Sequence, residues 1–150
     1  MNTNNLLAKL KRKLGNTSAN STGSDSSLKS LDATVLTLTT EPDSKRDFCE
    51  FLNGVGFPDL IKYVDFIDAC HQLNYMDDKQ LRDSINYIYN RHIRKYAPDK
   101  IFFELALVFE IETKLTKEDF TSEFYLKATQ HCIQKIEKPF NLFVESQDWY

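Results

Sequence analysis

The stretch from residue 77 to residue 96, DDKQLRDSINYIYNRHIRKY, holds the clearest structural pattern in this 150-residue chain. Its apolar and aromatic residues recur every three or four positions, and Asp77 or Asp78 can cap a helix at its start. The pattern predicts an amphipathic helix. Its apolar face would hold Leu81, Ile85, Ile88, Tyr89, Ile93 and Tyr96.

Helical spacing continues on both sides of this stretch. Upstream, Ser44 and Asp47 resemble a capping box for a short helix that ends near Gly54, and Pro58 suits the first turn of the next helix. Downstream of Pro98, one amphipathic helix is expected. Its apolar set contains Ile101, Phe102, Leu105, Val108 and Phe109.

The remaining helices are expected near the C-terminus. Thr116 can cap a helix that runs to Pro139, and a last short helix would carry Phe140 and Phe143. Glycine and proline number only four each, which is scarce for a turn-rich β fold. The chain is therefore predicted to be all-α, an irregular bundle of short helices.

Aromatic residues mark where the folded part begins, because all 11 Phe, 7 Tyr and 1 Trp lie at or after Phe48. A Ser/Thr/Asn-rich run, NTSANSTGSDSS, precedes it and predicts a flexible linker. Residues 34–40, TVLTLTT, are expected to be extended or docked on the core. The predicted organisation is a basic amphipathic segment at 1–14, a linker at 15–35 and one helical domain at 36–150.

The N-terminal segment combines an apolar stripe with positive charge. It holds four bases and no acid, whereas the rest of the chain holds the other 15 of the 19 bases and all 22 acids, a net charge of −7. This composition is typical of a helix on an anionic membrane surface, and the alternative is a basic tail without a partner. The residues concerned are Leu6, Leu7, Lys9, Leu10, Lys11, Arg12, Lys13 and Leu14.

Cysteine use and hydropathy predict a cytoplasmic protein. The three cysteines are few and odd in number, which argues against a disulfide framework and favours a reducing compartment. The chain has neither the roughly 20-residue apolar run that a membrane span needs nor an apolar signal peptide. A peripheral location at the inner face of the plasma membrane is expected if the N-terminal segment binds lipid.

The sequence offers no pattern for an active site. Neither phosphate-binding glycine motif is present, and the acidic body lacks the basic stripe of a nucleic-acid-binding protein, so neither a nucleotide cofactor nor nucleic acid is expected. The pairs Cys70-His71 and His131-Cys132 suggest zinc, but neighbours on a helix point about 100° apart and could hardly reach one tetrahedral ion. No metal, cofactor or catalytic residue is predicted.

From about residue 36 to the end, the order of landmarks resembles the regulator of G-protein signalling (RGS) domain, a bundle of about nine short helices. The opening of that domain, D-P-E followed by F-R-E-F-L, is similar to EPD and DFCEFL here. The later landmarks have matching order and intervals. They are PDLIKYV at 58–64, Ile88-Tyr89, Ile93, APDKI at 97–101, Tyr125 with Ala128, and FVES at 143–146 with Tyr150.

This resemblance implies binding to an activated Gα subunit and acceleration of its GTP hydrolysis. In the family, Gα supplies its own arginine and glutamine and the partner holds the switch loops in their transition-state arrangement, so this chain would need no catalytic residue. The family's contact loops map onto residues 56–59, 97–102 and 138–142. The resemblance assigns Gα contacts to Asp59, Asp99, Lys100, Phe102, Asn141 and Leu142.

Three of these positions depart from the family pattern. Asp59 and Phe102 stand where the family has asparagine, and Leu142 stands where it has arginine. Each lost polar contact costs roughly 1 to 3 kcal/mol, so two functions remain open. The first is a Gα-binding regulator that damps G-protein signalling, and the second is an RGS-fold interaction scaffold without GTPase-accelerating activity. A third reading is an unrelated helical domain with an accidental match.

Overall fold

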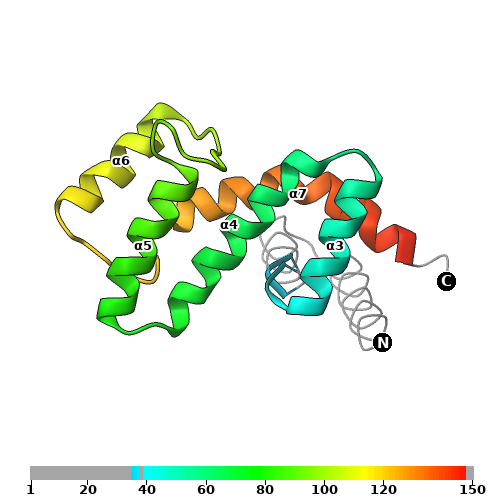
Figure 1. Cartoon of the computed structure of the whole chain (residues 1–150), viewed down its shortest axis with the longest axis horizontal. Coiled ribbons are helices and arrows are strands. Elements are labelled where there is room, and N and C mark those ends of the chain that lie inside the picture. The colour runs from blue at the N-terminus through cyan, green and yellow to red at the C-terminus, as the bar shows by residue number, and fades with distance from the viewer. Residues whose placement is uncertain (1–34, 38, 148–150) are drawn as a thin grey trace, which may run out of the picture. The chain divides into compact units, whose positions relative to one another are not determined.

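A computed structural model describes residues 35–37 and 39–147, and these residues contain no strand (Figure 1). The all-α prediction is confirmed for this part of the chain. The count differs from the expected nine, since the described residues form six α-helical segments: one that includes residues 35–37 and 39–40, and the five numbered helices. In order, the elements are α3 (Pro42–Gly54), η1 (Pro58–Leu60), α4 (Ile61–Gln72), η2 (Leu73–Tyr75), α5 (Asp78–His92), α6 (Leu105–Thr116) and α7 (Leu126–Gln147).

The predicted membrane-binding residues, Leu6 to Leu14, and most of the predicted linker lie outside the described residues. No helix in the described part is both long and apolar enough to cross a bilayer.

Residues 35–37 and 39–40 are helical where an extended segment was one of the expectations. The hydroxyl groups of Thr39 and Thr40 donate to the carbonyls of Val35 and Leu36, at 2.7 and 2.6 Å. Val35 and Thr39 are fully buried. Helical hydrogen bonding and burial therefore override the β-propensity of this threonine-rich stretch.

Helix α3 starts earlier than predicted. Its N-cap is Glu41, whose carboxylate accepts hydrogen bonds from the backbone N–H of Ser44 at 3.0 Å and from its hydroxyl at 2.8 Å. Pro42 occupies the first helical turn, where its missing N–H costs nothing. The proposed capping role of Ser44 with Asp47 was wrong, because both residues lie inside the helix.

Helix α5 confirms the most strongly patterned prediction. Asp77 caps it, and Asp77 and Gln80 form a reciprocal capping box with bonds of 2.8 and 3.1 Å. The helix ends at His92, so Tyr96 lies beyond it and is 78% exposed instead of belonging to its apolar face.

Two predicted boundaries near the C-terminus were wrong. Thr116 ends α6 and does not cap the following helix, which begins ten residues later at Leu126. Pro139 lies inside the continuous helix α7, so the expected separate last helix does not exist. Phe140 and Phe143 are nevertheless buried, so the apolar face continues past the proline.

The described residues divide into two compact units, one formed by those up to Pro58 together with 136–147, and the other by residues 59–135. In the first unit, the ring of Phe48 on α3 lies 5.9 Å from that of Phe140 and 5.3 Å from that of Phe143. In the second unit, the fully buried ring of Phe66 on α4 lies 5.4 Å from His92, 5.5 Å from Phe103 and 5.7 Å from Tyr125. Each unit is thus built around its own aromatic cluster.

The helices α3 and α6 end in the same kind of cap with different residues. After α3, Gly56 has φ 88°, and the N–H groups of Gly56 and Phe57 bond to the carbonyls of Asn53 and Leu52. After α6, Glu118 has φ 54°, and the equivalent bonds run from the N–H groups of Glu118 and Asp119 to the carbonyls of Leu115 and Lys114. Both are Schellman motifs, which favour glycine at the left-handed position.

Replacing Glu118 with glycine is expected to raise the free energy of unfolding by about 1 kcal/mol, because glycine adopts the left-handed conformation without a Cβ clash. Denaturant unfolding of the full chain measures this change. The neighbouring variant Lys117→Gly is the matched control and should lower stability, since Lys117 has φ −80°. A loss of stability in Glu118→Gly would contradict the prediction.

Candidate functional site

Residues 97–102 join α5 to α6 and are fastened to the last turn of α5 by the backbone. The N–H of Asp99 donates to the carbonyl of Arg91 at 3.0 Å, and the N–H of Ile101 donates to the carbonyl of His92 at 2.9 Å. The segment therefore holds a defined path against the helix end.

Two side chains of α5 hold Asp99 in addition. The Nδ1 atom of His92 lies 2.9 Å from the carbonyl oxygen of Asp99, and Nη2 of Arg91 lies 2.8 Å from its carboxylate. Burial lowers the pKa of His92, although the bond to Asp99 opposes this. The ring is therefore neutral at pH 7, and Nδ1–H donates to the carbonyl.

Lys100 also points back to α5. Its Nζ atom donates to the carbonyls of Ile93 and Arg94, both at 3.1 Å. These carbonyls follow the end of the helix, where no intrahelical donor remains for them. Asp99 and Lys100 thus hold the loop in place, and their role as partner contacts stays a prediction.

Phe102 is presented outward by the same loop. Its neighbours Ile101 and Phe103 are 1% and 8% exposed, whereas Phe102 is 75% exposed. The side chains on both sides of Phe102 are thus packed in the core, while its own ring is directed to solvent. Nζ of Lys100 lies 5.7 Å from the centre of its ring.

The other three predicted contacts lie on different elements. Asp59 is exposed in η1, in the same unit as the loop at 97–102. Asn141 and Leu142 belong to the other unit and are exposed on α7, so the expected loop at 138–142 is a helix. The structure brings Asp99, Lys100 and Phe102 together in one segment.

Helix α6 has exposed apolar residues that the sequence analysis assigned to its buried face. Leu105 is 86% exposed and Phe109 is 73% exposed, while Ile111 is the buried residue of this helix. A signal was present in the sequence, because LALVFEIETKL has apolar residues on more than one side of a helix. One buried face cannot accommodate all of them.

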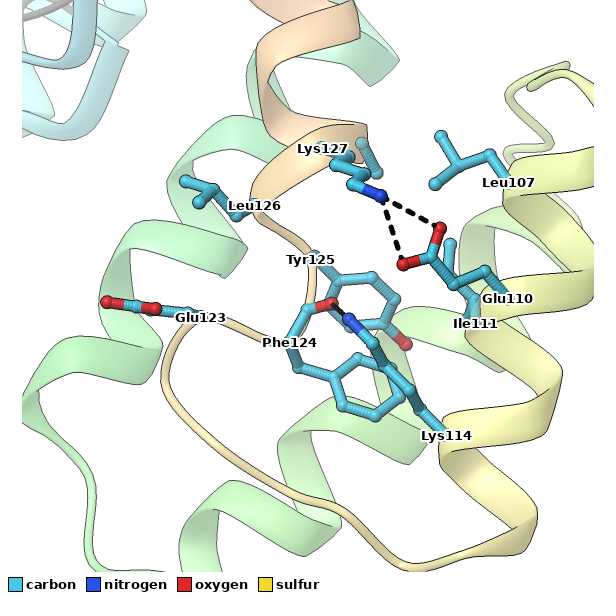
Figure 2. A pocket seen from close by; sticks show the side chains of 10 residues that line it. Leu107, Glu110, Ile111, Lys114, Glu123, Phe124, Tyr125, Leu126 and Lys127 are labelled. Carbon is cyan, nitrogen blue, oxygen red and sulfur yellow. Dashed lines mark hydrogen bonds and ion pairs between the residues drawn. The ribbon is translucent and has the colours of Figure 1, made fainter.

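The second unit also contains a pocket of about 210 Å³ between α6 and the segment that leads into α7 (Figure 2). Nζ of Lys127 lies 3.2 Å from both carboxylate oxygens of Glu110, and Nζ of Lys114 donates to the carbonyl of Phe124 at 3.4 Å. Figure 2 shows Glu123 directed away from these groups. The hydroxyl of Tyr125, which also lines the pocket, donates to the carbonyl of Ile85 at 2.7 Å.

The cysteine and histidine pairs do not form a metal site within the described residues, where no group of three or more ligating side chains converges. Cys70 and Cys132 are buried, and burial raises the pKa of both thiols. They are therefore uncharged thiols of the core at neutral pH.

A family model for the regulator of G-protein signalling domain matches residues 34–150. The chain belongs to the RGS family. The recognition made from the sequence landmarks is thereby confirmed. A search of curated proteins found no match.

Membership in the RGS family carries a general functional meaning. RGS domains bind Gα subunits and accelerate their GTP hydrolysis, and they do so without a catalytic site of their own.

Proposed function

We propose that this protein binds an activated Gα subunit through a surface that includes residues 97–102, and that it accelerates GTP hydrolysis and so damps signalling. The presentation of Phe102 carries this proposal. The ring is 75% exposed, and its loop is anchored by Arg91, His92 and Lys100. Large aromatic residues on preorganised loops are common anchors of protein interfaces.

The residues of the proposed surface have two roles. Phe102, Asp59, Asn141 and Leu142 are exposed and would contact the partner. Asp99 and Lys100 are positioning residues, because their side chains hold the loop to α5. The rate effect would come from holding the Gα switch loops, since catalysis needs groups that favour the transition state over the ground state.

The proposed location is the cytoplasm, with the basic residues of 1–14 placing the protein at the inner face of the plasma membrane. Lys9, Lys11, Arg12 and Lys13 provide the positive charge, and attraction to anionic lipid is worth about 1 kcal/mol per base. At that surface the protein would meet its Gα partner.

The test compares binding of the full chain to Gα with GDP alone and to Gα with GDP and a planar γ-phosphate mimic. Selective binding to the mimic is expected, with Phe102→Ala weakening it by about 10- to 100-fold, the loss typical of an interface anchor. Tyr75→Ala is the matched control, because Tyr75 is 74% exposed and lies in η2. Single-turnover GTP hydrolysis then measures acceleration.

A second candidate function is a scaffold that has kept the RGS fold without GTPase-accelerating activity. Phe102 favours it, because phenylalanine lacks the amide with which the family's asparagine makes polar contacts. Equal or absent binding to both nucleotide states of every Gα tested would support the scaffold and contradict the proposed regulator.

A further inference from the structure

Helix α6 exposes two large apolar side chains on one face. Leu105 and Phe109 are 86% and 73% exposed and lie four residues apart, so they are neighbours along the helix. We call these two residues the α6 patch. Leaving both in water is unfavourable, and such patches commonly mark interaction sites.

The α6 patch begins three residues after Phe102 in the chain. Glu104 is the N-cap of α6, and its carbonyl accepts the N–H groups of Leu107 and Val108 at 3.0 and 3.1 Å. Phe102 therefore lies two residues before the cap, and Leu105 is the first residue of the helix. From Leu105 to Phe109 the helix rises by only about 6 Å.

The short separation between Phe102 and the start of α6 determines how much of this surface one partner would cover. One side of an ordinary protein interface covers about 800 Å², a footprint roughly 30 Å across. A partner that covers Phe102 would therefore also reach the start of α6. Contact at the loop and contact at the α6 patch would belong to one interface.

The charges beside the patch argue against a membrane as its occupant. Helix α6 is preceded by Glu104 and carries Glu110 and Glu112, with Lys114 as its one base. Lys127 pairs with Glu110 at 3.2 Å, and Lys114 donates to the carbonyl of Phe124, so neither base offers a free positive charge to lipid. The carboxylates of Glu104 and Glu112 would repel an anionic lipid surface, whereas an apolar protein surface would not.

We infer that the α6 patch extends the Gα contact from Phe102 along α6, and that the partner is a Gα subunit whose facing surface is apolar. This inference rests on the proposed function, because it takes Gα as the partner. Burial of Leu105 and Phe109 would supply affinity that the family obtains from polar contacts. The α6 patch would thereby select among Gα subunits by the apolar character of that surface.

The experiment uses the full chain with the double substitution Leu105→Ser/Phe109→Ser and measures binding to Gα carrying GDP and the planar γ-phosphate mimic. The affinity is expected to fall at least 30-fold, about 2 kcal/mol. The control is Tyr75→Ser/Leu126→Ser, whose side chains are 74% and 52% exposed, and it should bind within twofold of the unmodified chain. Circular dichroism and thermal unfolding establish that both variants fold.

The outcomes separate this inference from the proposed function. If the unmodified chain binds Gα and the α6 double variant binds within threefold of it, the inference fails and the proposed function stands. If the unmodified chain binds no Gα, both fail. The inference is also overturned if the substitutions leave Gα binding intact and instead abolish self-association in sedimentation or capture by phosphatidylserine vesicles, which would assign the patch to a second copy or to lipid.

Discussion

Replacing Phe66 with alanine is expected to lower the free energy of unfolding by about 3 to 5 kcal/mol, the cost of a large cavity in a core. Phe66 on α4 is fully buried. Its ring contacts three rings from different parts of the chain: His92 at the end of α5, Phe103 before α6 and Tyr125 before α7. The cavity would remove packing from all three, and equilibrium denaturation of the full chain measures the loss.

The same substitution at Phe109 is the control for Phe66→Ala. Phe109 is 73% exposed, so Phe109→Ala should change the free energy of unfolding by less than about 0.5 kcal/mol. A loss below about 1 kcal/mol in Phe66→Ala would show that the aromatic cluster collapses around the missing ring. That result would contradict the role assigned to Phe66 as the centre of the second unit.

Replacing Lys100 with methionine is expected to lower the free energy of local opening of the loop at 97–102 by about 1 to 3 kcal/mol. The reason is that two charge-assisted hydrogen bonds are lost. These are the bonds from Nζ to the carbonyls of Ile93 and Arg94. Amide exchange of Asp99 and Ile101 reports the change, since their N–H groups bond to α5. Their exchange should accelerate about 10- to 100-fold.

Lys95→Met is the matched control for Lys100→Met. Lys95 is exposed, and its Nζ lies 5.4 Å from the ring centre of the neighbouring Tyr96, so its replacement should leave exchange at Asp99 and Ile101 unchanged. Unchanged exchange in Lys100→Met itself would mean that the backbone bonds and His92 suffice to hold the loop. Lys100 would then be free to contact a partner, as the resemblance to the RGS domain implies.

The sequence predicted those features of the fold that depend only on residues within one short segment. A cap at Asp77 or Asp78 and the periodicity from Leu81 to Ile88 depend only on neighbouring residues, and α5 has Asp77 as its cap and that buried face. The predicted helix boundaries that depend on contacts between residues far apart in the sequence were wrong. Pro139 reads as a helix end, yet α7 continues through it, with Phe140 and Phe143 packed against Phe48.

The sequence predicted the candidate surface only in part, because it shows which residues are neighbours in the chain and not where their side chains point. Sequence order placed Asp99, Lys100 and Phe102 in one segment but gave no information on their directions. The folded chain turns Lys100 toward the carbonyls of α5 and exposes Phe102, because Ile101 and Phe103 on either side are buried. Which residue contacts a partner and which holds the loop depends on this packing.

The sequence by itself determined the all-α class, the strongest helix and the RGS family, since local hydrogen bonding, apolar periodicity and the order of landmarks are properties of the chain. Only the tertiary structure decided that Leu105 and Phe109 face solvent and that the side chains of Asp99 and Lys100 bond to the end of α5 and the residues after it. The physical reason is that apolar periodicity shows which faces of a helix can be buried, whereas contacts with distant segments determine which face is buried.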